Sequence, residues 1–202
     1  MPKLTVELIP KSCHFSNVRS MVTPYEWDKI RKLSYEKANH KCEICGNTGL
    51  KQGFKHAVEC HEIWHYDDEN KIQKLTGLIS LCVLCHQVKH IGRAIAIGNQ
   101  VPCFNHLARV NKWTQEQVHQ HIVDSFKVHT ERSKYKWTLD ISLLKNPPYN
   151  ITINESEERK FNEKPYKKKV KKKSGPKKKH PSSKIGDYLK KPTNNKRPPK
   201  KT

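Results

Sequence analysis

The chain has 202 residues, of which 34% are hydrophobic, and its formal net charge is +21. These values exclude a single compact globule built from the whole length, and they favour a modest core with a charged appendage. No stretch approaches the ~18 apolar residues that a membrane-spanning helix needs, and residues 1–10 lack the apolar segment of a secretory signal.

The N-terminal part, residues 1–40, predicts an arm followed by one helix. Apolar residues alternate between Leu4 and Ile9, which is typical of a short strand or an extended arm. Thr23-Pro24 combines a capping hydroxyl with proline at the first helical position, and predicts a helix from Pro24 to about Asn39.

The next part, residues 41–98, predicts an α+β unit. The segment 56–66 alternates as a strand does, and the polar residues 67–70 end it. Residues 75–81 form a second apolar run. Residues 82–97 then predict one continuous helix that ends at Gly98.

Residues 99–150 predict a helical extension of the same domain. The segment 104–110 has helical character, and Thr114 with Gln117 matches a capping box that opens a helix to about Tyr135. Residues 137–144 are expected to pack back on the core. The pair Pro147-Pro148 then ends regular structure.

The positive charge is concentrated in the last part of the chain. Residues 164–202 contain 17 Lys or Arg residues and a single acid, Asp187. Such a segment cannot bury enough apolar surface to offset the entropy of ordering, so residues 151–202 predict a disordered, Lys-rich tail.

The tail is typical of a segment that binds DNA through charge rather than through base sequence. The alternative is a solubilising or import-like run without a role in binding. Inside the tail, Ile185, Tyr188 and Leu189 are faintly similar to peptides that dock on sliding clamps. The lysines expected to contact DNA are Lys167, Lys168, Lys169, Lys171, Lys172, Lys173, Lys177, Lys178 and Lys179.

Two CxxC pairs, Cys42/Cys45 and Cys82/Cys85, form the strongest motif. They supply four thiolates, the usual ligand set of a closed tetrahedral zinc site. In a reducing compartment, paired cysteines are better interpreted as metal ligands than as disulfides. The 36 residues between the pairs exceed the ~15–20 of a plain zinc ribbon, so the sequence predicts a structural zinc ion with an insert between its two knuckles. Scattered reduced cysteines are the alternative.

Three histidines accompany the cysteine pairs. His86 and His90 are four residues apart and share one helical face, which suits two imidazoles on one metal ion. His61 lies on the expected strand within the insert. Taken alone, the pair also fits a solvent-exposed face, and His61 fits an ordinary strand residue.

Together these features resemble the HNH, or ββα-metal, nuclease superfamily. There, a strand histidine follows one CxxC, and a second strand leads into CxxCH and a short helix. The similarity to a group of bacterial HNH endonucleases covers about residues 4–145 and excludes the tail. It is carried by residues 15–20, 59–68, 81–92, 106–113 and 137–142.

The resemblance implies a zinc-stapled ββα-metal core with flanking helices, and a role for each histidine. His61 would be the general base that activates water. His86 and His90 would hold Mg²⁺ or another divalent ion, which neutralises charge on the scissile phosphate.

The chain departs from the family pattern at two positions. Cys60 stands where the family commonly has Asp or His as a metal ligand, and a thiolate there favours zinc; otherwise Glu59 or Glu62 would take that place. Gly77 stands where the family has its central Asn, for which nearby Asn70 or Gln73 are the substitutes.

The sequence therefore predicts a metal-dependent endonuclease that hydrolyses DNA phosphodiesters, in a bacterial or phage setting of cytoplasm or nucleoid. The alternative is a catalytically inactive HNH-like zinc module that binds DNA or a replication or transcription partner. A third hypothesis, a charge-driven packaging protein, explains the tail but not the position of His61.

Overall fold

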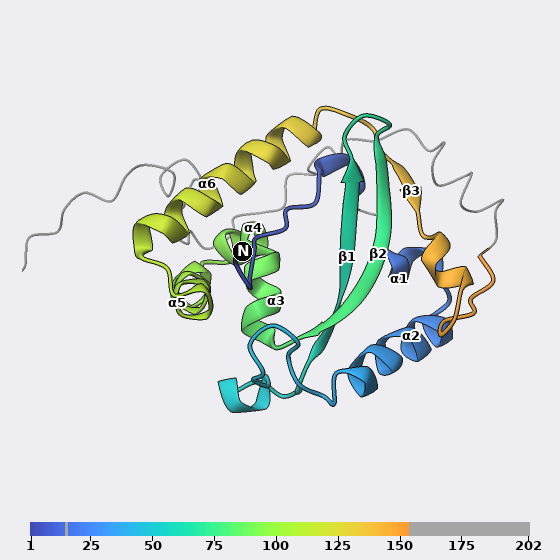
Figure 1. The fold of residues 1–202 in the computed structure, drawn as a ribbon, viewed down its shortest axis with the longest axis horizontal. Coiled ribbons are helices and arrows are strands. Elements are labelled where there is room, and N and C mark those ends of the chain that lie inside the picture. The colour runs from blue at the N-terminus through green and yellow to red at the C-terminus, as the bar shows by residue number, and fades with distance from the viewer. Residues whose placement is uncertain (15, 154–202) are drawn as a thin grey trace, which may run out of the picture.

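The computed structural model describes residues 1–14 and 16–153 as an α+β fold around one small sheet (Figure 1). The predicted tail lies outside the described residues from residue 154 on, and this part includes the lysines expected to contact DNA and the cluster of Ile185, Tyr188 and Leu189. No helix of the described part is long and apolar enough to cross a membrane.

Six α-helices, three short 3-10 helices and three strands make up the described chain. The strands are β1 (Glu59–Asp67), β2 (Ile72–Leu81) and β3 (Thr138–Asp140). The α-helices are α1 (Val18–Met21), α2 (Pro24–Lys37), α3 (Val83–Lys89), α4 (Ile91–Ala96), α5 (Gln100–Asn111) and α6 (Gln115–Arg132). The 3-10 helices are η1 (Lys11–Cys13), η2 (Leu50–Gln52) and η3 (Ser142–Lys145).

The sheet has the order β1-β2-β3. β1 and β2 form an antiparallel hairpin, and β3 pairs with β2 in parallel. The register shifts by one between Ile63 and Trp64, because Ile63 pairs with Gly77 and Trp64 with Leu75, so that Thr76 is the extra residue. The bulge therefore lies on β2. Adjacent side chains of a regular strand, such as those of Cys60 and His61 on β1, face opposite sides of the sheet.

Both predicted helix starts are confirmed. Thr23 and Thr114 each accept a hydrogen bond from the backbone N–H three residues on, and each completes a capping box with Glu26 or Gln117. α2 ends at Lys37, slightly before the predicted end, since Asn39 and His40 adopt positive φ angles of 49° and 54°.

The expectation of one helix over residues 82–97 is wrong. The chain leaves helical geometry at His90, which has φ −100° and ψ 42° and separates α3 from α4. The carbonyl of His90 accepts hydrogen bonds from the N–H groups of both Arg93 and Ala94, and this starts the second helix. The first residues form an extended arm rather than a strand (Figure 1).

Two apolar clusters lie on the two sides of the sheet. One joins the arm, α3–α6 and Leu81. The other joins α1, α2, Leu78 and the segment after β3. Ile151 and Ile153, only 5% and 8% exposed, belong to the second cluster. The packed core thus extends three residues past the boundary expected at 150.

Candidate metal centres

Four sulfur atoms, which we call the cysteine cluster, meet at the base of the hairpin. The Sγ atoms of Cys42, Cys45, Cys82 and Cys85 lie within 4.8 Å of one another, and those of Cys45 and Cys82 are 3.5 Å apart. This exceeds the ~2.05 Å of a disulfide and is close to the ~3.8 Å expected between sulfurs bound tetrahedrally at ~2.3 Å from zinc. The four cysteines therefore lie close enough together to hold one zinc ion.

Local structure presents these sulfurs to one point. Gly46 has a φ of 70°, which favours glycine, and its N–H donates to the carbonyl of Cys42 at 2.8 Å, closing the first knuckle. Cys82 is the N-cap residue of α3 and Cys85 lies in its first turn. The knuckle between β2 and α3 thus places both sulfurs at one helix end.

Two side-chain N–H groups approach the same sulfurs. Gln52 donates from Nε2 to the Cys82 Sγ at 3.1 Å, and His106 Nε2 lies 3.1 Å from the Cys85 Sγ. His106 Nδ1 contacts the Arg109 guanidinium at 2.9 Å. Since a guanidinium only donates, Nδ1 accepts and Nε2 carries the proton directed at sulfur. Both contacts stabilise negative charge on sulfur, as zinc-bound thiolates require.

A second group, which we call the histidine cluster, consists of His61, His86 and His90. One ring nitrogen of each lies within 4.8 Å of the others. The ring centroids are 5.2 Å apart for His61 and His86, 5.0 Å for His61 and His90, and 4.8 Å for His86 and His90. β1 supplies the His61 ring, α3 supplies the His86 ring, and His90 is the residue directly after α3. The set matches the nitrogen ligands that divalent metals such as zinc accept.

Each of two cluster histidines bonds to a carboxylate. His86 Nδ1 is 2.5 Å from Glu59 Oε2, and Glu59 Oε1 is 2.9 Å from His56 Nε2. His61 Nε2 is 3.0 Å from Glu7 Oε2. A carboxylate on one ring nitrogen orients the ring and leaves the lone pair on the other, which is the usual arrangement around metal-binding histidines.

Burial favours the neutral form of His61 and His90. His61 is 5% exposed, and burial lowers its pKa below the ordinary value despite the opposing effect of Glu7. Burial, together with the charges of His86 and His61, lowers the pKa of His90 to about 3. The hydrogen bond from His86 lowers the pKa of Glu59. Neutral imidazoles beside ionised carboxylates are the forms that bind a cation or accept a proton.

The structure does not bring Cys60 to the histidine cluster, which corrects its expected role as a metal ligand. Cys60 is an even-numbered residue of β1, so it faces the opposite side from His61 and packs in the second apolar cluster. Burial raises the pKa of its thiol to about 11, so it stays protonated. Of the two expected substitutes, Glu59 reaches the cluster through His86, whereas Glu62 accepts from the Val18 N–H at 2.6 Å.

Among the described residues, none of the expected substitutes for the central Asn of the HNH pattern lies in the histidine cluster. Gly77 pairs with Ile63 within the hairpin. Asn70 donates to Asp67 at 2.8 Å in the hairpin turn. Gln73 is fully buried and donates to the Ser16 carbonyl at 3.3 Å. Both amides therefore have structural partners elsewhere.

Solvent reaches the histidine cluster through two recesses. One opens at His86, whose side chain is 24% exposed, and the other lies between β1, the arm and α6. The first is lined by Glu59, Val83, His86, Gln87, His90, Arg93, Ala94 and Ile97. The second includes Glu7, His61, Tyr66, His90 and Arg132. His90 lines both recesses.

Sequence reasoning missed Glu7, His106 and Lys89. Glu7 is 54 residues from His61 in sequence, and no local motif marks it. His106 is 21 residues from Cys85. Contacts between residues so far apart in the sequence form only when the arm and α5 fold against α3.

Comparisons with known proteins do not assign the chain to a family. No family model matches it, and neither the curated proteins nor the solved structures contain a significant match. The HNH resemblance therefore stays a prediction from the motifs, and the two clusters are the observations on which a function has to be argued.

Proposed function

We propose that this protein is a metal-dependent nuclease of the HNH type that hydrolyses phosphodiester bonds of DNA. The observation that carries the proposal is the histidine cluster, in which one ring nitrogen each of His61, His86 and His90 lies within 4.8 Å of the others. His86 directly follows Cys85 of the cysteine cluster in the chain. The chain order of β1, β2 and α3 is the order that the ββα-metal resemblance implies, with His61 on β1, His86 on α3 and His90 directly after α3.

In this proposal His86 and His90 hold the catalytic divalent ion, Mg²⁺ or another. The bound ion supplies charge neutralisation at the scissile phosphate and the leaving oxygen. The chain's own contribution is to orient the rings. Glu59 holds the proton of His86 on Nδ1, and this leaves Nε2 with the lone pair that a cation needs.

His61 acts as the general base in the same proposal. It is neutral because burial lowers its pKa, so it is able to accept a proton from water at neutral pH. Arg93 is exposed and lines the same recess as His86 and His90, and its guanidinium is suited to contact a phosphate there.

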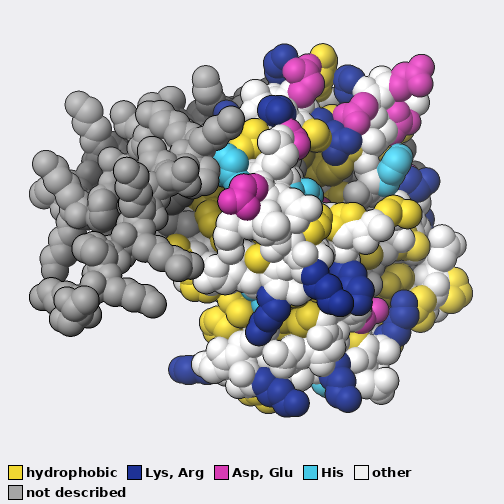
Figure 2. Space-filling view, turned by 60° about the vertical axis from the view of Figure 1, so that its left-hand side comes forward, with side chains coloured by type: hydrophobic (Ala, Val, Ile, Leu, Met, Phe, Trp, Pro, Cys, Tyr) yellow, Lys and Arg dark blue, Asp and Glu magenta, His cyan; other side chains and the backbone are white. Residues whose placement is uncertain are grey.

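The cysteine cluster holds a structural Zn²⁺ in this proposal, which implies a reducing, intracellular setting. The Lys-rich tail adds non-specific affinity for DNA. Lys and Arg side chains also spread over the lower half of the face turned forward in Figure 2. Docking of Ile185, Tyr188 and Leu189 on a sliding clamp is a further partner hypothesis, on residues outside the described part.

The test is plasmid cleavage by the full chain, after removal of loosely bound metal with EDTA and addition of Mg²⁺, Mn²⁺ or Zn²⁺. Wild type is expected to nick or linearise the plasmid. His61→Ala is expected to lose this activity while keeping one zinc ion per chain. His65→Ala is the matched control, because His65 lies on the same strand but is exposed. Equal cleavage by wild type and His61→Ala would contradict the assigned base.

A second candidate function is a zinc module that binds DNA, or a replication or transcription partner, without cutting. Two observations favour it: Cys60 faces away from the histidine cluster, and no amide takes the place of the central Asn in the described residues. It predicts tight, salt-sensitive binding of DNA by wild type and His61→Ala alike, with no cleavage in any of the three metals.

A further inference from the structure

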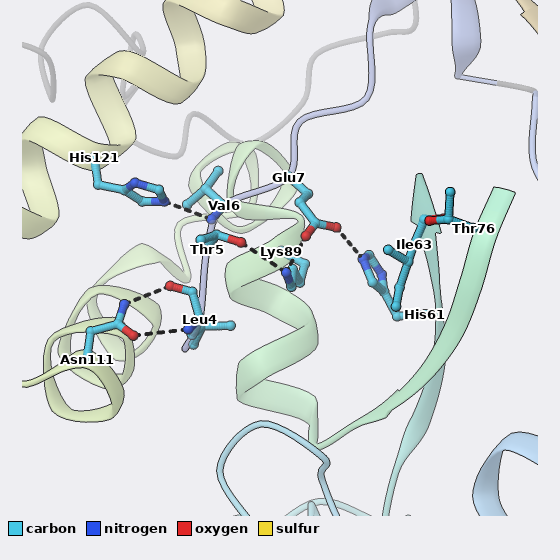
Figure 3. A network of polar contacts seen from close by, with 10 residues as sticks. All are labelled: Leu4, Thr5, Val6, Glu7, His61, Ile63, Thr76, Lys89, Asn111 and His121. Carbon is cyan, nitrogen blue, oxygen red and sulfur yellow. Dashed lines mark hydrogen bonds and ion pairs between the residues drawn. The ribbon is translucent and has the colours of Figure 1, made fainter. Parts of the chain in front are cut away.

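The N-terminal arm is fastened along α3, α5 and α6 by polar contacts (Figure 3). Asn111 accepts from the Leu4 N–H at 3.0 Å and donates to the Leu4 carbonyl at 2.7 Å. The Val6 N–H donates to His121 Nε2 at 2.9 Å. The Glu7 N–H donates to the Lys89 carbonyl at 3.0 Å. Leu4, fully buried, anchors the arm in the first apolar cluster. These contacts fix the backbone on both sides of residues 5 and 6.

The arm delivers the Glu7 carboxylate into the site (Figure 3). One oxygen, Oε2, lies 3.0 Å from His61 Nε2. The other, Oε1, accepts from the Lys89 ammonium, which also donates to Thr5 Oγ1 at 3.1 Å. Burial would raise the pKa of Glu7, but the hydrogen bond with His61 and the charge of Lys89 outweigh it and lower the pKa to about 2. Glu7 is therefore ionised at neutral pH.

A carboxylate oxygen accepts a hydrogen bond from a ring nitrogen that carries a proton, so the 3.0 Å contact with Glu7 holds a proton on His61 Nε2 and leaves Nδ1 for the lone pair. We propose that Glu7 is a positioning residue that holds His61 in this tautomer and orientation, with the arm and Lys89 holding Glu7. The role rests on the proposed nuclease function, because it concerns the ring assigned there as the base. The N-terminal arm thus belongs to the site rather than to its surroundings.

A purely structural role for Glu7 makes a different prediction. In that role the carboxylate only neutralises Lys89, whose side chain is 9% exposed. Removing both charges, as in Glu7→Gln with Lys89→Met, would then restore a normal site. In the positioning role the double variant stays defective, since the amide introduced by Glu7→Gln presents either its oxygen or its NH₂ to Nε2 and no longer specifies the tautomer.

The direct test is the tautomer of His61, measured in the full chain by ¹⁵N-edited NMR of the imidazole nitrogens with zinc retained and no other metal added. Assignment uses a His61→Ala sample. Wild type is expected to show a single Nε2-protonated form. Glu7→Gln, and Glu7→Gln/Lys89→Met, are expected to show a mixture of both tautomers. Glu36→Gln, the same chemical change on an exposed helix residue, is expected to match wild type.

Cleavage kinetics give a second readout. Loss of an outer partner of this kind typically lowers activity about 10–100-fold, and here the loss is expected in kcat, with KM and zinc content unchanged. In Glu7→Gln alone, the Lys89 ammonium loses its ion-pair partner, and this could cause misfolding. The double variant removes that ammonium as well, so it tests the positioning role without this effect.

Two outcomes would overturn the inference: an unchanged His61 tautomer in Glu7→Gln, or wild-type tautomer and rate in the double variant. If wild type cleaves no DNA in any metal, the nuclease proposal fails, and the NMR measurement still decides whether Glu7 positions the ring.

Discussion

Replacing Glu7 by Gln should also destabilise the fold by an amount that the structure bounds. The difference between the ordinary carboxyl pKa of 4.5 and the folded value of about 2 corresponds to at most about 3 kcal/mol, at 1.36 kcal/mol per pKa unit. The Glu7 side chain is 38% exposed, so solvent screening reduces this to about 1–2 kcal/mol. A lowered carboxyl pKa stabilises the fold fully above the unfolded value near 4.5 and loses its effect as pH falls to about 2, so neutral pH captures all of it.

The assay is a double-mutant cycle of urea unfolding at pH 7 with zinc present, using wild type, Glu7→Gln, Lys89→Met and the double variant. We expect a coupling energy of about 1 kcal/mol or more between Glu7 and Lys89. A coupling energy within the ~0.3–0.5 kcal/mol of independent sites would refute the reasoning that the two charges depend on each other.

Three further predictions concern the metal sites and the extent of the domain. Cys85→Ala should lose the zinc ion and the cooperative fold, whereas Cys60→Ala should keep both, as measured by metal analysis and circular dichroism; zinc loss in Cys60→Ala would contradict the cluster assignment. A chain ending at residue 150 should be less stable by about 3–6 kcal/mol than one ending at 153, because it lacks Ile151 and Ile153; equal urea midpoints would place the end of the core before 151. Glu59→Gln should weaken Mn²⁺ binding to the histidine cluster about 10–100-fold in calorimetry without changing zinc content, and unchanged affinity would remove Glu59 from the site.

Local sequence patterns were sufficient to predict those structural features that depend on residues close together in the chain. The capping boxes at Thr23 and Thr114 specify helix starts by hydrogen bonds that span three residues. The pairing of the two CxxC motifs follows from chemistry, since four thiolates at that spacing share one ligand preference. Both predictions agree with the structure because neither needs knowledge of distant contacts.

Strand alternation is by itself sufficient to separate Cys60 from His61. Adjacent residues of a strand face opposite sides of the sheet, so Cys60 and His61 do not present their side chains to one ion while the strand stays regular. The resemblance suggested otherwise, because it compares positions rather than directions. In β1, the His61 ring lies beside His86 and His90, whereas Cys60 packs in the second apolar cluster.

Only the tertiary structure brought Glu7, Lys89 and His106 to the sites. Their partners are 54 residues away for Glu7 and 21 for His106, and a single Glu or His in an arm or helix carries no pattern. The end of α3 at His90 was also visible only in the structure. Although the helix ends there, the rings of His86 and His90 still lie close enough together to bind one ion. The sequence motifs therefore specify which side chains are able to bind a metal ion. The packing of the arm and α5 on α3 determines which polar groups orient those side chains. A hydrogen bond requires its two atoms to lie ~3 Å apart, whatever their separation in the sequence, so only the folded structure shows these partners.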